Sequence, residues 1–203
     1  MPRVKICGIT STLDAKAAVD AGADALGVVF YAQSSRCVSI SQAREISQVV
    51  GPFVTLVGLF VNATVAEVNS VLASVPIHVL QFHGDEDAAF CEQFQRPYLK
   101  AIRMRPELDL DAAIAAHPNA GGILLDAYRK GVPGGTGESF DWRRVPVPSS
   151  QAIVLAGGLN PDNIQKALAA CDVWGVDVSG GVESAPGQKD HGAIKQFIEK
   201  VRQ

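Results

Sequence analysis

The feature of this 203-residue chain that most constrains its fold is an end-to-end alternation of short apolar runs with Ala-rich segments of helical periodicity. Near-continuous apolar strands are typical of a parallel sheet that is covered by helices. A strand–helix unit of roughly 20–28 residues, repeated eight times, predicts an α/β fold that closes as a single (β/α)8 or TIM barrel, one domain over residues 1–203. The predicted strands are Val4–Cys7, Ala25–Phe30, Thr55–Val61, His78–Phe82, Tyr98–Arg103, Gly122–Asp126, Ile153–Ala156 and Trp174–Val178.

The segments between the strands carry helix start and stop signals. A helix is expected to open at Asn160-Pro161, as an N-cap followed by proline, and a stunted one to follow the Gly-rich loop Gly131–Gly137. A doubly wound open sheet is the alternative, but its first turn usually carries GxGxxG, which Cys7-Gly8-Ile9-Thr10 lacks. The other expected helices are Thr12–Ala21, Gln42–Val50 behind a Ser41 cap, Val65–Ala73 behind Thr64, Glu86–Phe94, Leu110–Ala116 and Gly192–Val201.

The composition excludes several classes of protein. A net charge of -3 lacks the basic excess of a nonspecific nucleic-acid binder, so we expect no nucleic-acid partner. No apolar run reaches the roughly 18 residues that cross a bilayer, and the N-terminal sequence has no secretory core, so we expect a cytoplasmic protein without a membrane partner. The four cysteines and four histidines are too scattered to predict a disulfide framework or a metal site.

Reactive side chains gather at the predicted carboxyl ends of the strands, where (β/α)8 barrels carry their active sites. Arg36 lies in the loop after the second strand, on the same side of the barrel. We therefore expect the active site among these residues, which are Cys7, Asn62, His83, Asp126, Gly157-Gly158 and Ser179-Gly180-Gly181.

Alternation of side chains along each strand places partners below these ends. Lys5 shares a face with Cys7, and Asp177 lies on the eighth strand, which neighbours the first in a closed barrel. Because a buried lysine is unfavourable without a partner, we predict a Lys5–Asp177 ion pair inside the barrel. A cation beside a thiol favours the thiolate, but the pair with Asp177 is expected to offset much of that effect.

Cys7 and Asp126 are the predicted base and acid of the site. A carboxyl group at the edge of an apolar interior suits a general acid, and a thiolate suits a base. Together they favour proton transfer around a carbonyl or an imine, whereas hydrolysis would call for a histidine beside the nucleophile. The alternative is structural: Cys7 fills the strand as a small apolar side chain, and Asp126 caps the following loop.

Paired glycines after the seventh and eighth strands predict a phosphate site. In such barrels the loops at these places bind phosphate through backbone N–H groups, and glycine lets the backbone approach the oxygens closely. Arg36 fits a substrate carboxylate, and its alternative is a solvated surface position.

Taken together, the motifs resemble the phosphoribosylanthranilate isomerase family. The resemblance extends over essentially the whole chain, in order, and the Lys-Ile-Cys-Gly start is highly specific. The stretches that carry it are Lys5–Thr10, Gly58–Asn62, Leu80–Gly84, Leu125-Asp126, Gly134–Gly137 with Phe140–Trp142, Leu155–Pro161, Gly175–Glu183 and Pro186–Asp190.

The resemblance implies an Amadori rearrangement of N-(5′-phosphoribosyl)anthranilate, a tryptophan-pathway step, without cofactor or metal. It implies that Cys7 is the general base, that Asp126 is the general acid and that Arg36 holds the anthranilate carboxylate. His83 and Asp177 are assigned to substrate binding. The family usually has proline where this chain has Ser35, which is expected to loosen the loop that presents Arg36. The phosphate-binding residues are expected to be Gly157, Gly158, Ser179, Gly180 and Gly181.

Two other functions stay open at this point. A related sugar-phosphate isomerase of histidine biosynthesis works with two carboxylates, and its first strand would end in Asp where this chain has Cys7. A non-catalytic sugar-phosphate sensor would need the phosphate loops alone, so the presence of both Cys7 and Asp126 argues against it. We expect a phosphorylated small molecule as the substrate and a monomer in solution, with a homodimer as the alternative.

Overall fold

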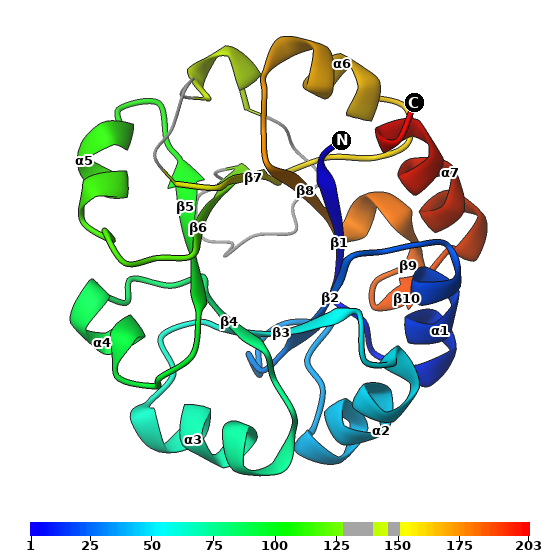
Figure 1. Ribbon diagram of the computed structural model, residues 1–203, viewed down its shortest axis with the longest axis vertical. Helices are drawn as coiled ribbons and strands as arrows, with labels where there is room; N and C mark the ends of the chain where they lie inside the picture. The colour runs from blue at the N-terminus through cyan, green and yellow to red at the C-terminus, as the bar shows by residue number, and fades with distance from the viewer. Residues whose placement is uncertain (128–139, 146–150) are drawn as a thin grey trace.

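A closed barrel of eight parallel strands forms the centre of the molecule (Figure 1). The computed structural model describes residues 1–127, 140–145 and 151–203. Each strand pairs with the next along the chain, and β8 pairs with β1, so the predicted (β/α)8 barrel is confirmed. The strands are β1 Arg3–Cys7, β2 Ala25–Val29, β3 Thr55–Phe60, β4 Val79–Phe82, β5 Tyr98–Met104, β6 Gly122–Ala127, β7 Ile153–Leu155 and β8 Gly175–Val178.

Helices form an outer ring around the barrel (Figure 1). Between β6 and β7 the described residues include only a 3-10 turn, η1 Trp142–Arg144, where a stunted helix was expected. The predicted loop Gly131–Gly137 lies outside the described residues. No described helix is long and apolar enough to cross a membrane. The α-helices are α1 Thr12–Asp20, α2 Ile40–Val50, α3 Val65–Ser74, α4 Ala88–Glu92, α5 Leu110–Ala115, α6 Ile164–Ala170 and α7 His191–Val201.

Side-chain caps explain where the helices begin, and they correct two predictions. Thr64 caps α3 as predicted, but α2 is capped by Ser39 and not by Ser41, because Ser39 and Gln42 exchange reciprocal side-chain bonds in a capping box. The predicted start at Asn160-Pro161 is also wrong. The Asn160 side chain accepts bonds from the amides of Asp162 and Asn163, which forms a turn and delays α6 to Ile164.

A short antiparallel hairpin between β8 and α7 was not predicted. It follows the 3-10 turn η2 Gly180–Val182 and consists of β9 Glu183–Ala185 and β10 Gln188–Lys189. Its turn at Gly187 has φ of +80° and receives a hydrogen bond from the Thr10 hydroxyl to its carbonyl. The hairpin thereby packs against the loops that follow β1 and β2 at the carboxyl end of the barrel.

The barrel interior contains an ion pair that the strand alternation predicted. The closure of the barrel sets Lys5 opposite Asp177, and Lys5 Nζ lies 2.9 Å from Asp177 Oδ1, with the two side chains 6% and 8% exposed. Burial, the largest single influence, would lower the pKa of Lys5, but Asp177 and Cys7 together outweigh it through charge and hydrogen bonding and hold that pKa above its ordinary value. Lys5 is therefore a fixed cation at the closing seam of the barrel.

Replacing Lys5 by Met leaves the Asp177 carboxylate buried without its cation. We expect Lys5→Met to lower the free energy of unfolding by about 3 kcal/mol, measured by urea denaturation. The double variant Lys5→Met/Asp177→Leu removes both charges and should recover most of that loss. A Lys5→Met protein as stable as the wild type would show that the pair contributes little.

Candidate active site

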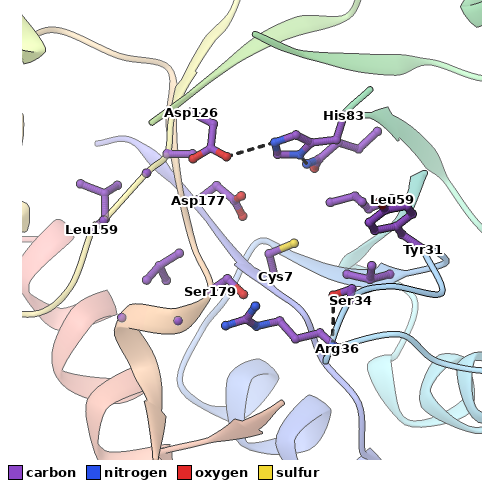
Figure 2. A pocket seen from close by; sticks show the side chains of 18 of the residues that line it. Cys7, Tyr31, Ser34, Arg36, Leu59, His83, Asp126, Leu159, Asp177 and Ser179 are labelled. Atoms are coloured by element: carbon purple, nitrogen blue, oxygen red, sulfur yellow. Dashed lines mark hydrogen bonds and ion pairs between the residues drawn. The ribbon is translucent and has the colours of Figure 1, made fainter. Parts of the chain in front are cut away.

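With the exception of Asn62, the predicted site residues line a single pocket at the carboxyl ends of the strands (Figure 2). The sequence did not single out the apolar side chains that complete the wall, among them Val29, Leu59 and Leu159, or the polar residues Tyr31 and Ser34. The predicted residues in the pocket are Cys7, Arg36, His83, Asp126, Gly157, Gly158, Asp177, Ser179, Gly180 and Gly181.

Asn62, which the sequence also placed at a strand end, does not line this pocket. It has φ of +50°, donates its backbone N–H to Glu86, and accepts a hydrogen bond from Asp85 on its side-chain oxygen. Asn62 therefore orders the neighbouring loop. Cys37, Cys91 and Cys171 also lie outside the pocket, and no group of three described His, Cys, Asp or Glu residues is arranged to hold a metal ion.

Cys7 ends β1 and packs with Val29 and Leu59. Burial raises the pKa of its thiol, and the lowering influence of nearby Lys5 is smaller, so the net shift is upward. Lys5 therefore favours the thiolate of Cys7, as predicted, but burial of the thiol outweighs this effect. Part of the reason is that Asp177 already pairs with Lys5. At neutral pH the resting group is the thiol.

The space for this thiol comes from a glycine on the neighbouring strand. Gly27 of β2 pairs with Cys7, and a Cβ atom at position 27 would lie 2.8 Å from Cys7 Sγ and 3.0 Å from Lys5 Nζ. Any larger residue would displace both groups from the floor of the pocket.

Asp126 and His83 form the opposite wall of the pocket (Figure 2). Asp126 Oδ2 lies 3.0 Å from His83 Nε2, and Asp126 Oδ1 accepts the backbone N–H of Ala127 at 2.9 Å. The far side of the imidazole, Nδ1, lies 3.1 Å from the amide nitrogen of Gln81. Asp126 therefore bonds the backbone of its own strand with one oxygen and keeps the other toward the pocket and His83. The loop that it was expected to cap in the structural alternative lies outside the described residues.

Arg36 is held by a contact that the sequence did not reveal. Its Nε and Nη2 each lie 2.7 Å from a carboxylate oxygen of Glu183 in β9, and Ser34 Oγ accepts the backbone N–H of Arg36 (Figure 2). Lys189 of β10 bonds the same carboxylate at 2.8 Å. Burial opposes ionisation of Glu183, but Arg36 and Lys189 outweigh it and hold the pKa of Glu183 below its ordinary value.

This arrangement orients Arg36 although Ser35 stands where the family usually has proline. The Glu183 bonds use Nε and Nη2, which leaves Nη1 for a ligand. Two cations around one carboxylate also leave this side of the pocket with a positive charge, which suits an anionic ligand group.

The glycine loops after β7 and β8 interlock. Gly157 and Gly158 have φ of +80° and +65°, and a Cβ at Gly157 would overlap the backbone nitrogen of Ala127. A Cβ at Gly181 would overlap the carbonyl oxygen of Leu159 from the other loop. The two loops can approach each other and a ligand only because these positions lack side chains. Ser179 Oγ is buried here without a hydrogen-bond partner among the described residues.

The closed barrel, with its acid–base groups and glycine loops at the carboxyl end, defines the class of (β/α)8-barrel enzymes. A family model described as N-(5'phosphoribosyl)anthranilate (PRA) isomerase matches residues 4–200, and the chain belongs to this family.

Relatives and solved structures agree with the family. The N-(5'-phosphoribosyl)anthranilate isomerase of Cellvibrio japonicus is 64% identical over 195 residues, which cover 96% of this chain and 91% of the relative. Phosphoribosyl anthranilate isomerase from Thermotoga maritima superimposes with a TM-score of 0.90 at 39% identity, covering 100% and 99% of the two chains. A phosphoribosyl anthranilate isomerase in complex with reduced 1-(o-carboxyphenylamino)-1-deoxyribulose 5-phosphate has a TM-score of 0.88 at 39% identity, covering 100% and 99% of the two chains.

The raised pKa of Cys7 predicts how its thiol reacts. Because only the thiolate is alkylated, we expect iodoacetamide to modify Cys7 slowly at pH 7. The rate should rise about tenfold per pH unit to beyond pH 9. Peptide mapping by mass spectrometry in a Cys37→Ser background, which removes the exposed thiol, follows the reaction. A rate that levels off below pH 8 would contradict the upward shift.

Proposed function

We propose that Cys7 and Asp126 are the base and the acid of a (β/α)8-barrel isomerase of tryptophan biosynthesis. The reaction converts N-(5'-phosphoribosyl)anthranilate to 1-(2-carboxyphenylamino)-1-deoxy-D-ribulose 5-phosphate. The observation that carries the assignment is the placement of a buried thiol and a buried carboxyl group around one pocket that also holds the glycine loops.

The acid step falls to Asp126. Its carboxyl group protonates the ring oxygen of the ribose, the bond from that oxygen to C1 breaks, and the anthranilate nitrogen supplies the electrons for a C1=N iminium. His83 Nε2, 3.0 Å from Asp126 Oδ2, is in position to stabilise the carboxylate that remains. General acid catalysis of this kind typically accelerates a reaction by about 10² to 10⁴-fold.

The base step falls to Cys7. The iminium acidifies the proton on C2, and the thiolate removes it to give an enolamine, which becomes the ketone when C1 gains a proton and the C2 hydroxyl loses one. Burial keeps most of Cys7 protonated at rest, but the thiolate fraction is a correspondingly strong base. Positive charge on the iminium favours that thiolate further.

The two ends of the substrate have separate partners. The backbone N–H groups of the interlocked loops at Gly157-Gly158 and Gly180-Gly181, with Ser179, are proposed to bind the phosphate. Arg36, held by Glu183, is proposed to bind the anthranilate carboxylate. His83 and Asp177 complete the substrate-binding set through the pocket wall.

The remaining expectations concern the surroundings of the enzyme. We propose one domain over residues 1–203, a cytoplasmic location and a phosphorylated small molecule as the partner, without nucleic acid or membrane. A monomer is the expected state and a homodimer the alternative. A T. maritima relative is described as dimeric, and Phe53 and Trp174 are 96% and 58% exposed in this chain. Large exposed apolar side chains favour association, which supports the alternative.

Loss of either proton-transfer group should abolish turnover without unfolding the barrel. We expect Cys7→Ser and Asp126→Asn each to lower kcat/KM by about 10³-fold, followed by the decay of anthranilate adduct fluorescence. Circular dichroism and urea denaturation serve as the folding control. A near-native rate in either folded variant would remove that residue from its role.

The same fluorescence assay distinguishes the proposed isomerase from the histidine-pathway isomerase and from a non-catalytic sensor. The histidine-pathway analogue is offered beside the anthranilate adduct, and we expect turnover of the anthranilate adduct. Preferential turnover of the analogue would favour the histidine-pathway isomerase, and binding without turnover would favour the sensor.

Truncation of Arg36 should weaken substrate binding more than it slows the chemical step. A charge-assisted hydrogen bond is worth about 1.5–3 kcal/mol, so we expect Arg36→Ala to raise KM about 10- to 100-fold with kcat within about threefold. Arg44→Ala on the exposed face of α2 is the matched control and should leave both constants unchanged. An unchanged KM in Arg36→Ala would limit Arg36 to holding the β9–β10 hairpin through Glu183.

A further inference from the structure

Gln81, His83 and Asp126 are linked by consecutive hydrogen bonds on the side of the pocket that holds the proposed acid. Gln81 of β4 contacts His83 Nδ1, and His83 Nε2 contacts Asp126 of β6, at 3.1 and 3.0 Å. Gln81 lines the floor of the pocket and is fully buried there. Its amide nitrogen is directed at His83, which in turn contacts Asp126 (Figure 2).

The amide of Gln81 decides which ring nitrogen of His83 carries the proton. A neutral imidazole has one N–H donor and one acceptor nitrogen. The Gln81 atom facing Nδ1 is the amide nitrogen, which can only donate, so Nδ1 has to accept. The proton of His83 then lies on Nε2, where it is donated to Asp126 Oδ2.

The other end of the Gln81 amide is unusual. Its oxygen is buried and has no hydrogen-bond partner among the described residues. An unbonded amide oxygen is unfavourable in a barrel interior, and an apolar side chain would avoid it. Leu59 and Leu99 occupy the paired positions on the neighbouring strands. Gln81 is thus polar where both neighbouring strands carry leucine, and its amide nitrogen contacts His83. This combination indicates a role that acts through His83.

The role follows from what happens to Asp126 during the reaction. As its proton leaves, negative charge grows on the carboxylate, and a donor already aimed at Oδ2 stabilises that charge more than it stabilises the neutral acid. The other tautomer would set a lone pair of Nε2 against the same oxygen.

We propose that Gln81 is a positioning residue for the general acid, whose amide holds His83 as the Nε2–H tautomer directed at Asp126. This inference rests on the acid role proposed for Asp126. It adds Gln81, on the buried floor of the pocket, as the group that sets the proton of His83 and thereby supports the acid.

The kinetic test is Gln81→Met, which keeps the length of the side chain and removes its donor. We expect kcat to fall about tenfold or more, part of what general acid catalysis supplies, while KM stays within about twofold. Leu124→Met, another change inside the barrel that spares the three-residue chain, is the matched control and should leave kcat unchanged. A purely structural role of Gln81 would lower the stability of Gln81→Met and leave the kcat of the folded enzyme at the wild-type value.

The spectroscopic test reads the tautomer itself. In a 15N spectrum of the histidine rings, with His83 assigned by its loss in His83→Asn, we expect a protonated Nε2 and an unprotonated Nδ1 in the wild type. Gln81→Glu places an acceptor opposite Nδ1 and should move the proton to Nδ1. The wild-type spectrum needs no variant of Gln81, so it decides the question even if Gln81→Met does not fold.

The outcomes separate this inference from the function on which it rests. A protonated Nδ1 in the neutral wild-type ring, or a folded Gln81→Met with the wild-type kcat, overturns the role of Gln81. If Asp126→Asn is inactive in the same assay, only that role falls. If Asp126→Asn is as active as the wild type, the acid assignment and the inference fall together.

Discussion

Ionisable side chains inside the barrel have to be paired, and this requirement organises the pocket. Lys5 pairs with Asp177 across the closing seam, Asp126 lies against His83 across the mouth, and the side chain of Glu183 is shared by two cations from different loops. Except for the Glu183–Lys189 pair within the β9–β10 hairpin, these contacts join segments that are distant in sequence. The charge balance of the interior therefore also fixes the relative positions of the strand ends.

The two groups proposed as base and acid differ in how they meet this requirement. Asp126 has a hydrogen-bond partner for each of its oxygens, so the protein already supplies contacts for the carboxylate that the proposed acid step would leave. Cys7 meets the requirement by staying neutral, because its neighbours Val29 and Leu59 are apolar and the charge of Lys5 is directed to Asp177. The two sides of the pocket therefore differ in polarity: hydrogen-bond donors surround Asp126, whereas apolar side chains surround the Cys7 thiol.

Much of this could be predicted from the sequence, since strand alternation and strand ends follow simple periodicities. They placed Lys5 beside Asp177 and brought Cys7 and Asp126 to one mouth. The contact of Glu183 with Arg36 could not be predicted, because it depends on a hairpin of five strand residues that carries no periodic signal. The net shift of the Cys7 pKa also depends on burial, which three-dimensional packing decides. The orientation of the Gln81 amide is likewise set only when β4 and β6 are assembled.

Closure of the barrel affects how the enzyme folds as it is synthesised. The first strand carries the thiol, but its ion-pair partner lies 172 residues later, on the last strand of the barrel to be synthesised. Until β8 arrives, β1 has one unpaired edge and Lys5 lacks its counter-ion, in a fold whose longest-range contact forms at the end. A partly synthesised chain thus contains the Cys7 thiol but no enclosed pocket, and catalytic competence should appear in one step, when the last strand docks beside the first.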